Sequence, residues 1–336
     1  MKIVFFEVEK WEEEYIKKSF PNQEVLLFSD KLDEKTIEKA LDAEIISTFI
    51  YSILNKEILS KLPKLKFLTT RSTGFDHIDI NFCKEKWIIV SNVPTYGVNT
   101  VAEHTFALIL AISRKIIPSV ERSKRGDFGL EGLRGMEIYG KTIGVVGVGH
   151  IGRRVVEIAA SFGMKIIAFT KNPQKNQDLK KFDSLEFVSL DELLSSSDII
   201  TLHLPLTPET HHIINMENIG KIKNGAILIN TARGGLIETQ AILEALKSGV
   251  LGGAGIDVLE EECSLKEERE LLTAEFLKSC DIKTQLLNHV LLTRENVVVT
   301  PHNAFNSKEA LIQIIETTCE NLKRFVDGKP QNIVSD

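Results

Sequence analysis

The feature of this 336-residue chain that most constrains its fold is a short apolar run followed at once by a glycine-rich turn. The run Thr142–Val146 leads into Gly147-x-Gly149-x-x-Gly152, and an amphipathic stretch follows. In such a unit Gly147 allows the tight turn, Gly149 lets the backbone approach a phosphate, and Gly152 permits close packing of helix against strand. The free amides at the start of the helix would then meet the charge of a pyrophosphate. The sequence therefore predicts a dinucleotide-binding βαβ unit.

The same alternation of β-rich runs and helix-length segments extends over most of the chain. Strands separated by helices indicate parallel sheets covered by helices, and right-handed crossovers make each sheet doubly wound. A chain of 336 residues also exceeds the size of one hydrophobic core. We therefore predict an α/β protein with two doubly wound parallel-sheet domains. The predicted strands are Lys2–Glu7, Glu24–Phe28, Glu44–Thr48, Lys66–Thr70, Trp87–Val90, Thr142–Val146, Lys165–Phe169, Ile199–Leu202, Ala226–Ile229, Ala254–Asp257 and Val297–Thr300.

One predicted helix is unusual. The segment from about Asn99 to Lys115 is apolar almost all round, so it should be buried, and another subunit could provide the cover. A charged, helical segment is predicted over Glu260–Asn288, and a final helix over Ser307–Asp327. The other predicted helices are Trp11–Phe20, Glu34–Leu41, Lys56–Leu59, Ile151–Phe162 and Thr239–Ser248.

Composition excludes several classes of function. The net charge of −6 argues against a nucleic-acid-binding surface, which normally needs a basic field. The N-terminus turns acidic within a few residues, and no apolar run approaches the roughly 20 residues that cross a bilayer. The four cysteines are scattered without a CxxC, and no cluster of metal ligands is visible along the chain. We expect a cytoplasmic protein with no metal, nucleic-acid partner or membrane partner.

Polar groups follow three of the predicted strands where each strand ends. They are Arg233, Glu262 and His302. Carboxyl ends of parallel strands are where open α/β sheets bind ligands, so we expect these groups to converge. Arg233 would grip a substrate carboxylate and polarise its carbonyl. His302 would protonate the developing alkoxide, and Glu262, paired with the imidazole, would favour its charged form. Because Glu260, Glu261 and Glu262 are consecutive, the backbone conformation of this segment decides which of them faces the imidazole. We favour Glu262.

At this point the chain resembles the D-2-hydroxyacid dehydrogenase family over essentially its whole length. The resemblance includes the glycine turn, the three catalytic segments and the stretches Arg71–Asp79, Asn92–Tyr96, Val101–His104 and Leu202–Thr210, all in the family's order. It implies an NAD(P)-dependent oxidoreductase that reduces a small 2-keto acid to the D-2-hydroxy acid. Pyruvate and D-lactate are the favoured pair.

The resemblance also implies an architecture. A Rossmann-type cofactor domain, residues 99–302, would be inserted in a flavodoxin-like substrate domain, residues 1–98 plus 303–336. The active site would lie in the cleft between the two domains. A homodimer is expected, with the long apolar helix and the cofactor domain at its interface.

Roles for single residues follow from the same resemblance. Arg233, Glu262 and His302 would be the catalytic trio. Backbone amides of Thr73 and Gly74 would hold the substrate carboxylate, Tyr96 and Phe305 would shape the pocket, and Tyr51 would keep the substrate side chain small. Independently of the resemblance, His104 is expected to be a packed or interface histidine, and His211 and His212 are expected at the mouth of a loop without chemistry. The implied cofactor contacts are Gly147, Gly149, His150, Ile151, Gly152, Thr170, Lys171, Leu204, Pro205, Thr210, Thr231, Ala232, Arg233 and Asp257, the last accepting from the nicotinamide amide.

Departures from the family pattern leave alternatives open. Thr170 stands where an acidic residue usually binds the ribose of NAD, and Lys171 follows it, so NADP(H) is possible beside NAD(H). Asn306 stands where lactate-type members often carry an aromatic residue, whereas the helical stretch after Glu262 favours the lactate branch. A glyoxylate or hydroxypyruvate reductase is the alternative within the class. A non-catalytic NAD-sensing interaction protein is the alternative from another class.

Overall fold

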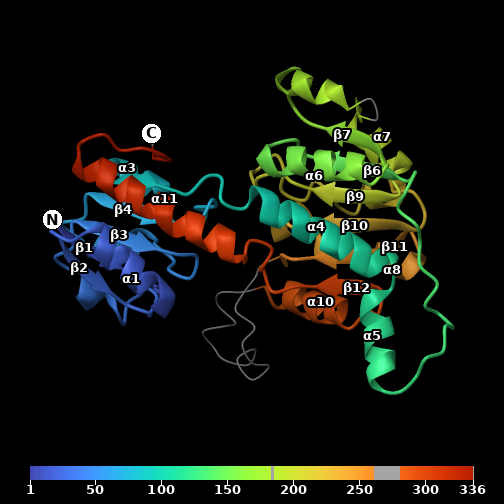
Figure 1. Cartoon of the computed structure of the whole chain (residues 1–336), viewed down its shortest axis with the longest axis horizontal. Coiled ribbons are helices and arrows are strands. Elements are labelled where there is room, and N and C mark those ends of the chain that lie inside the picture. The colour runs from blue at the N-terminus through green and yellow to red at the C-terminus, as the bar shows by residue number, and fades with distance from the viewer. Residues whose placement is uncertain (183–184, 261–280, 336) are drawn as a thin grey trace. The chain divides into compact units, whose positions relative to one another are not determined.

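The computed structural model describes residues 1–182, 185–260 and 281–335, and the chain divides into two compact units (Figure 1). Unit 1 consists of Met1–Tyr96 and Asn306–Asp336, and unit 2 consists of Gly97–Phe305. Among the described helices none is both long and apolar enough to span a membrane.

The described part of unit 1 contains a five-stranded sheet, parallel throughout, in the order β2-β1-β3-β4-β5 (Figure 1). Side chains alternate between the two faces of β1: Ile3 and Phe5 join the core under α1 and α11, whereas Val4 joins the core under α2 and α3. The sheet is therefore covered on both faces. The elements are β1 (Lys2–Phe5), α1 (Lys10–Ser19), β2 (Glu24–Leu27), β3 (Ile45–Thr48), α2 (Lys56–Leu59), β4 (Phe67–Thr70), α3 (Ile80–Glu85), β5 (Ile89–Ser91) and α11 (Lys308–Val326).

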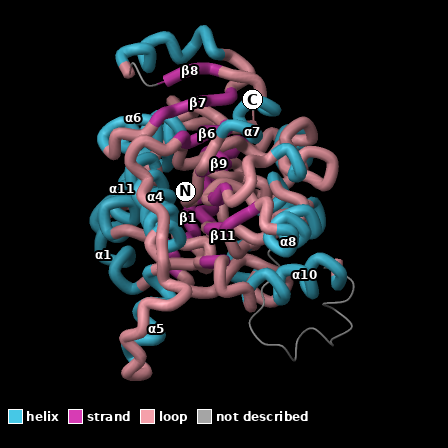
Figure 2. The backbone as a smooth tube through the Cα atoms, turned by 90° about the vertical axis from the view of Figure 1, so that its right-hand side faces the viewer, coloured by secondary structure: helices cyan, strands magenta, loops and turns pink. Residues whose placement is uncertain are grey.

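The described part of unit 2 contains a seven-stranded parallel sheet in the order β12-β11-β10-β9-β6-β7-β8. Strands β8, β7, β6 and β9 follow one another in Figure 2. Strand β6 pairs with both β7 and β9, so the chain changes direction across the sheet between β6 and β9. Ligands bind beyond the carboxyl ends of the strands at such a switch point. The strands are β6 (Thr142–Val146), β7 (Lys165–Phe169), β8 (Leu185–Phe187), β9 (Ile199–Leu202), β10 (Ala226–Asn230), β11 (Leu251–Ile256) and β12 (Val297–Val299).

Helices cover both faces of this second sheet. Helices α4 and α6 contribute to one hydrophobic core, and α7, α8 and α10 contribute to the other. Helix α5 follows α4 directly and buries none of its residues. The bounds are α4 (Val98–Ser113), α5 (Ile116–Lys124), α6 (His150–Ser161), α7 (Leu190–Ser196), α8 (Thr239–Ser248) and α10 (Ile282–Leu292).

The long apolar helix is α4, and unit 2 itself covers most of it. Its buried side chains include Phe106, Leu108 and Ile112, and they pack against the sheet. A Cβ added at Gly253 or Gly255 of β11 would lie within 3.1 Å of these side chains, so glycine allows the helix to approach the strand. The burial of α4 therefore does not require a second subunit.

Both sheets confirm the predicted α/β class, but several elements differ from the prediction. Strand β1 ends at Phe5 because Glu7 has a φ of 58°. Strand β11 begins at Leu251, three residues before the predicted start at Ala254. The prediction missed these residues because Gly252 and Gly253 interrupt the apolar pattern. Of the predicted helix Glu260–Asn288, residues 261–280 lie outside the described residues. The short elements α3, α5, α7 and β8 were not predicted.

Candidate active site

The glycine turn lies between β6 and α6, at the switch point of the unit 2 sheet. Gly147 has a φ of 96°, and a Cβ there would lie 2.7 Å from the carbonyl oxygen of His203. A Cβ at Gly152 would lie 2.0 Å from the carbonyl oxygen of Gly147. At Gly149, in contrast, a Cβ would meet nothing within 4 Å, so the backbone faces open space at the start of α6. This arrangement fits a pyrophosphate at the helix N-terminus.

Two loops flank this turn. Thr170 and Lys171 follow β7 directly, and the side chain of Lys171 is exposed. Leu204 and Pro205 follow β9. The hydroxyl of Thr210 is buried and donates to the carbonyl of Pro205 at 2.6 Å, so it closes its own loop.

The histidine in the second of these loops stays neutral. His203 accepts from or donates to the hydroxyl of Thr201 at 2.9 Å through Nε2, and its Nδ1 is buried without a partner among the described residues. Burial lowers its pKa from 6.5 to about 3. It therefore carries no charge at neutral pH, and its ring is a poor proton donor for catalysis.

Arg233 lies in the loop that follows β10. The loop is held by Asn230, whose side chain accepts from the amide of Ala232 at 3.0 Å and donates to the carbonyl of Arg233 at 2.8 Å. The preceding Thr231 is buried, with its hydroxyl 3.0 Å from that of Thr105 on α4. A Cβ at Gly234 would lie 1.9 Å from the carbonyl oxygen of Leu259, so the loops after β10 and β11 touch.

Asp257, directly after β11, organises the loop that carries His302. Its carboxylate is buried and accepts from the hydroxyl of Thr300 at 2.6 Å and from the amides of Asn303 and Ala304, each at 3.0 Å. Its carbonyl accepts from the amide of His302 at 2.8 Å. We therefore interpret Asp257 as a positioning residue for His302; its predicted contact with the nicotinamide amide stays a prediction.

His302 follows β12 in a left-handed backbone conformation, with a φ of 49°. Such a conformation costs a non-glycine residue roughly 1–2 kcal/mol, and the bonds to Asp257 hold it in place. On the other side of this loop, His104 of α4 lies 3.0 Å from the Thr300 hydroxyl. His104 thus supports the loop, as its predicted packing role requires. Strands β10 and β12 both flank β11, so Arg233 and His302 follow strands that are two positions apart at one edge.

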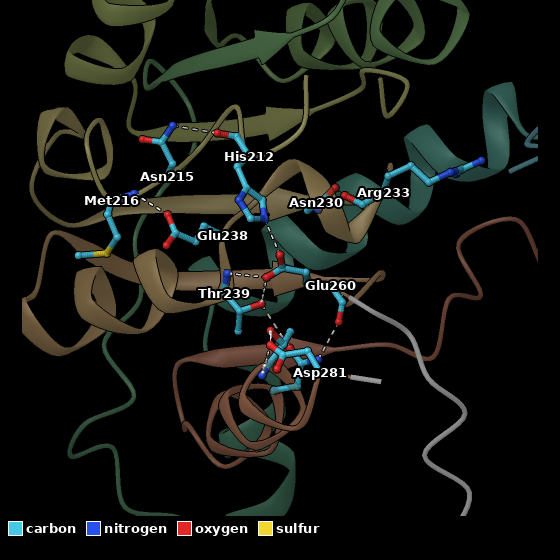
Figure 3. Close-up of polar contacts among 11 residues, drawn as sticks. His212, Asn215, Met216, Asn230, Arg233, Glu238, Thr239, Glu260 and Asp281 are labelled. Atoms are coloured by element: carbon cyan, nitrogen blue, oxygen red, sulfur yellow. Dashed lines mark hydrogen bonds and ion pairs between the residues drawn. The ribbon is translucent and has the colours of Figure 1, made fainter. Parts of the chain in front are cut away.

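The structure describes one of the three consecutive glutamates that could pair with His302, namely Glu260. The carboxylate of Glu260 has other partners: its Oε2 accepts from the amide and hydroxyl of Thr239 at 2.9 and 2.7 Å, and its Oε1 contacts Nε2 of His212 (Figure 3). The side chain of Arg233 extends away from this group (Figure 3). Glu262, the favoured catalytic glutamate, lies outside the described residues.

In unit 1, Thr73 and Gly74 follow β4. The Thr73 hydroxyl donates to the carbonyl of Val93 at 2.8 Å, and its own carbonyl accepts from Asn92 at 2.7 Å. Within the described residues the backbone amides of Thr73 and Gly74 have no hydrogen-bond partner. Two adjacent free amides in a fixed turn form a site for an anion such as a carboxylate. Tyr96 ends the first segment of unit 1, Phe305 ends unit 2, and both are half-buried.

The loop that carries Tyr51 is held by a carboxylate that sequence reasoning missed. Glu7 accepts from the amides of Phe49 and Tyr51 at 3.2 and 3.0 Å and from the hydroxyl of Ser52. The carbonyl of Glu7 accepts from the buried guanidinium of Arg71 at 2.6 Å. The Tyr51 side chain itself is 66% exposed. No motif marks Glu7, because the two backbone amides and the Ser52 hydroxyl that its carboxylate accepts from lie more than 40 residues away.

A switch-point glycine turn beside loops that carry an arginine and a histidine is typical of dinucleotide-dependent dehydrogenases. Residues 106–304 match the family model described as D-isomer specific 2-hydroxyacid dehydrogenase, NAD binding domain. The chain is 36% identical over 339 residues to a 2-hydroxyacid dehydrogenase homolog of Haemophilus influenzae, covering 99% of each chain. It is 35% identical over 335 residues to D-lactate dehydrogenase of Escherichia coli strain K12, covering 98% of each.

A solved structure gives the same result in three dimensions. The D-lactate dehydrogenase from Aquifex aeolicus, complexed with NAD and lactic acid, matches with a TM-score of 0.87 and 35% identity over 99% of both chains. The chain therefore belongs to the D-isomer specific 2-hydroxyacid dehydrogenase family and is an NAD-dependent oxidoreductase. The predicted family and enzyme class are confirmed.

Proposed function

We propose that this enzyme interconverts pyruvate and D-lactate, with Arg233, Glu262 and His302 as its catalytic residues. The observation that carries the proposal is the placement of Arg233 and His302 in loops at the carboxyl edge of the sheet that also bears the glycine turn. The names of the E. coli and A. aeolicus relatives support the substrate pair.

In the proposed reduction each group has one task. Bound NADH supplies the hydride that adds to the keto carbon. The Arg233 guanidinium polarises the carbonyl and stabilises the charge that develops on its oxygen. His302 donates a proton to that oxygen, giving the hydroxyl of D-lactate, and is reprotonated from solvent. Glu262 would keep the imidazole charged before this transfer.

Groups of unit 1 would bind the parts of the substrate that do not react. The free amides of Thr73 and Gly74 suit the substrate carboxylate. Tyr51, on the loop held by Glu7, would limit the size of the substrate side chain, and Tyr96 would shape the pocket. Phe305, the last residue of unit 2, is proposed for the same role. A methyl group such as that of pyruvate fits this limit.

On the cofactor side, Gly147, Gly149, Gly152, His150 and Ile151 would bind the pyrophosphate, and the segments after β9 and β10 would line the rest of the site. We propose that the enzyme also accepts NADP(H), because Thr170 brings no negative charge and Lys171 is exposed beside it. Thr170→Asp should disfavour NADPH by like-charge repulsion. An unchanged ratio of NADPH to NADH turnover would show that Thr170 does not determine the cofactor preference.

We propose a homodimer as well. Since unit 2 covers α4, the support comes from apolar side chains on and after α5: Ile116, Ile117 and Val120 are exposed, and Phe128 and Leu130 are 79% and 84% exposed. Exposed apolar side chains at this density along one segment suit an interface with another subunit. Leu130→Lys should shift the sedimentation behaviour from dimer to monomer. A cytoplasmic location stays a prediction from sequence.

A single kinetic panel tests the proposed function: pyruvate, glyoxylate and hydroxypyruvate, each with NADH and with NADPH. We expect the highest kcat/KM with pyruvate and NADH. A higher value with glyoxylate or hydroxypyruvate would favour the alternative reductase. Tight NADH binding without turnover of any 2-keto acid would favour the sensing protein and contradict the proposal.

A further inference from the structure

Unit 2 contains a group of side chains that could bind a metal ion, and this group is separate from Arg233 and His302. The side chains of His211, His212 and Glu260 each offer a ligand atom, and these atoms all lie within 4.8 Å of one another. The two imidazole rings are stacked, with centroids 3.8 Å apart and planes inclined by 28°. Nε2 of His212 contacts Oε1 of Glu260 (Figure 3). The sequence shows no such cluster, because the loops after β9 and β11 bring the residues together.

The surroundings hold each of these residues in place. Oε2 of Glu260 accepts from the amide and hydroxyl of Thr239, so Oε1 faces the imidazole of His212. The amide of His211 donates to Thr207 at 2.9 Å, and the amide of His212 donates to Gly235 at 2.8 Å. A ligand that binds here therefore meets a backbone that is already fixed. Preorganisation of this kind lowers the entropy cost of binding.

The donor set selects one class of ligand. Two imidazole nitrogens and one carboxylate oxygen suit Zn²⁺ and similar transition metals, whereas Mg²⁺ and Ca²⁺ prefer oxygen ligands. Atoms bound to one Zn²⁺ lie about 2 Å from it, hence no more than about 4 Å apart. Since the side chain of His211 is exposed, its ring can make this small adjustment by rotation about its side-chain bonds.

We propose that His211, His212 and Glu260 form a binding site for a divalent transition metal, with Zn²⁺ as the best match. The ion takes the place of the hydrogen bond between Nε2 of His212 and Oε1 of Glu260, the proton of that bond passes to solvent, and water completes the coordination. It joins the loop after β9 to the loop after β11 and so stabilises this edge of unit 2. The site uses none of the proposed catalytic residues, so the proposal stands apart from the proposed function.

The test is metal binding to the tag-free, chelator-treated full-length protein. Zn²⁺ is titrated by calorimetry, and Co²⁺ is titrated by visible absorption, which reports coordination geometry. We expect one equivalent to bind and the melting temperature to rise, because an ion that binds the folded state stabilises it. His211→Asn and His212→Asn should each weaken binding at least about tenfold.

The matched control is His289→Asn, an exposed histidine on α10 in the same unit. It should bind Zn²⁺ as the wild type does. Since the His211 ring is exposed, His211→Asn keeps the fold, and circular dichroism verifies this. Equal binding by the wild type and the His211→Asn variant would overturn the proposal. So would a thiolate-to-cobalt absorption band, which would assign the ion to cysteine.

Discussion

The two units offer different chemical groups to the proposed reaction. Unit 1 presents backbone amides, those of Thr73 and Gly74, and a loop whose anchor is Glu7. Unit 2 presents ionisable side chains, Arg233 and His302, and the loop of His302 is anchored by Asp257. In both units a carboxylate accepts from backbone amides of a loop that carries a site residue.

The difference lies in what each anchored group does. Backbone amides and a size-limiting loop bind the substrate equally well before and during reaction, so they act on KM. A proton donor acts only in the transition state, so it acts on kcat. We therefore expect unit 1 variants to change KM and unit 2 variants to change kcat. The following predictions test this division, from the largest expected effect to the smallest.

The largest effect is expected at His302. His302→Asn removes the proton donor and should lower kcat by about 10²–10⁴-fold, while the Kd for NADH, measured by fluorescence titration, stays the same. His289→Asn serves as the control for loss of a histidine from unit 2. Parallel losses of turnover and NADH affinity would contradict the proposed role.

Asp257→Asn should act on the same step through the loop. An amide nitrogen would face the amides of Asn303 or Ala304, so a buried donor would lose its acceptor, at a cost of about 1–3 kcal/mol of stability. Displacement of His302 should lower kcat by about 10²-fold. Denaturant unfolding and steady-state kinetics measure both effects. The exposed Asp191→Asn variant is the control, and a wild-type kcat in Asp257→Asn would refute the positioning role.

In unit 1, Glu7→Gln should act mainly on KM. A glutamine nitrogen would face the amide of Tyr51 or Phe49, and the loop would loosen. We expect KM for pyruvate to rise about tenfold, equivalent to about 1.4 kcal/mol, with kcat nearly constant and larger 2-keto acids better tolerated. Glu13→Gln, on the exposed face of α1, is the control. A fall in kcat at constant KM would contradict the expectation that unit 1 variants act on KM and unit 2 variants act on kcat.

The smallest effect is expected at His203. Because burial lowers its pKa to about 3, the ring is neutral from pH 5 to 9 and contributes no ionisation there. His203→Asn should therefore leave the midpoint of the pH profile of kcat/KM unchanged. A shifted midpoint would show that His203 titrates in the working range and would contradict its neutral state.

Local patterns in the sequence were sufficient for much of the fold. The glycine turn, the apolar strands and the long helix α4 each depend on neighbouring residues, so spacing alone predicts them. Where the pattern was interrupted, prediction failed: Gly252 and Gly253 concealed the start of β11, and the short elements α3, α7 and β8 carry too few apolar positions to show a period.

For the candidate site, too, some features could be predicted from the sequence and others could not. The positions of Arg233, His302 and the glycine turn at the ends of strands were predictable because each follows a recognisable strand, whereas their roles stay a prediction. The roles of Glu7, Asp257 and Glu260 were not, since a carboxylate in sequence does not show which amides it will meet.

By itself the sequence determined the α/β class, the dinucleotide turn and the residue types that suit reduction of a keto acid, because these depend on local periodicity and on the chemistry of single side chains. Only the tertiary structure decided that Asp257 holds the His302 loop, that α4 is covered by its own unit, and that two histidines meet Glu260. Such relations join residues tens of positions apart, and they arise from strand order and from the packing of loops at the edge of a sheet.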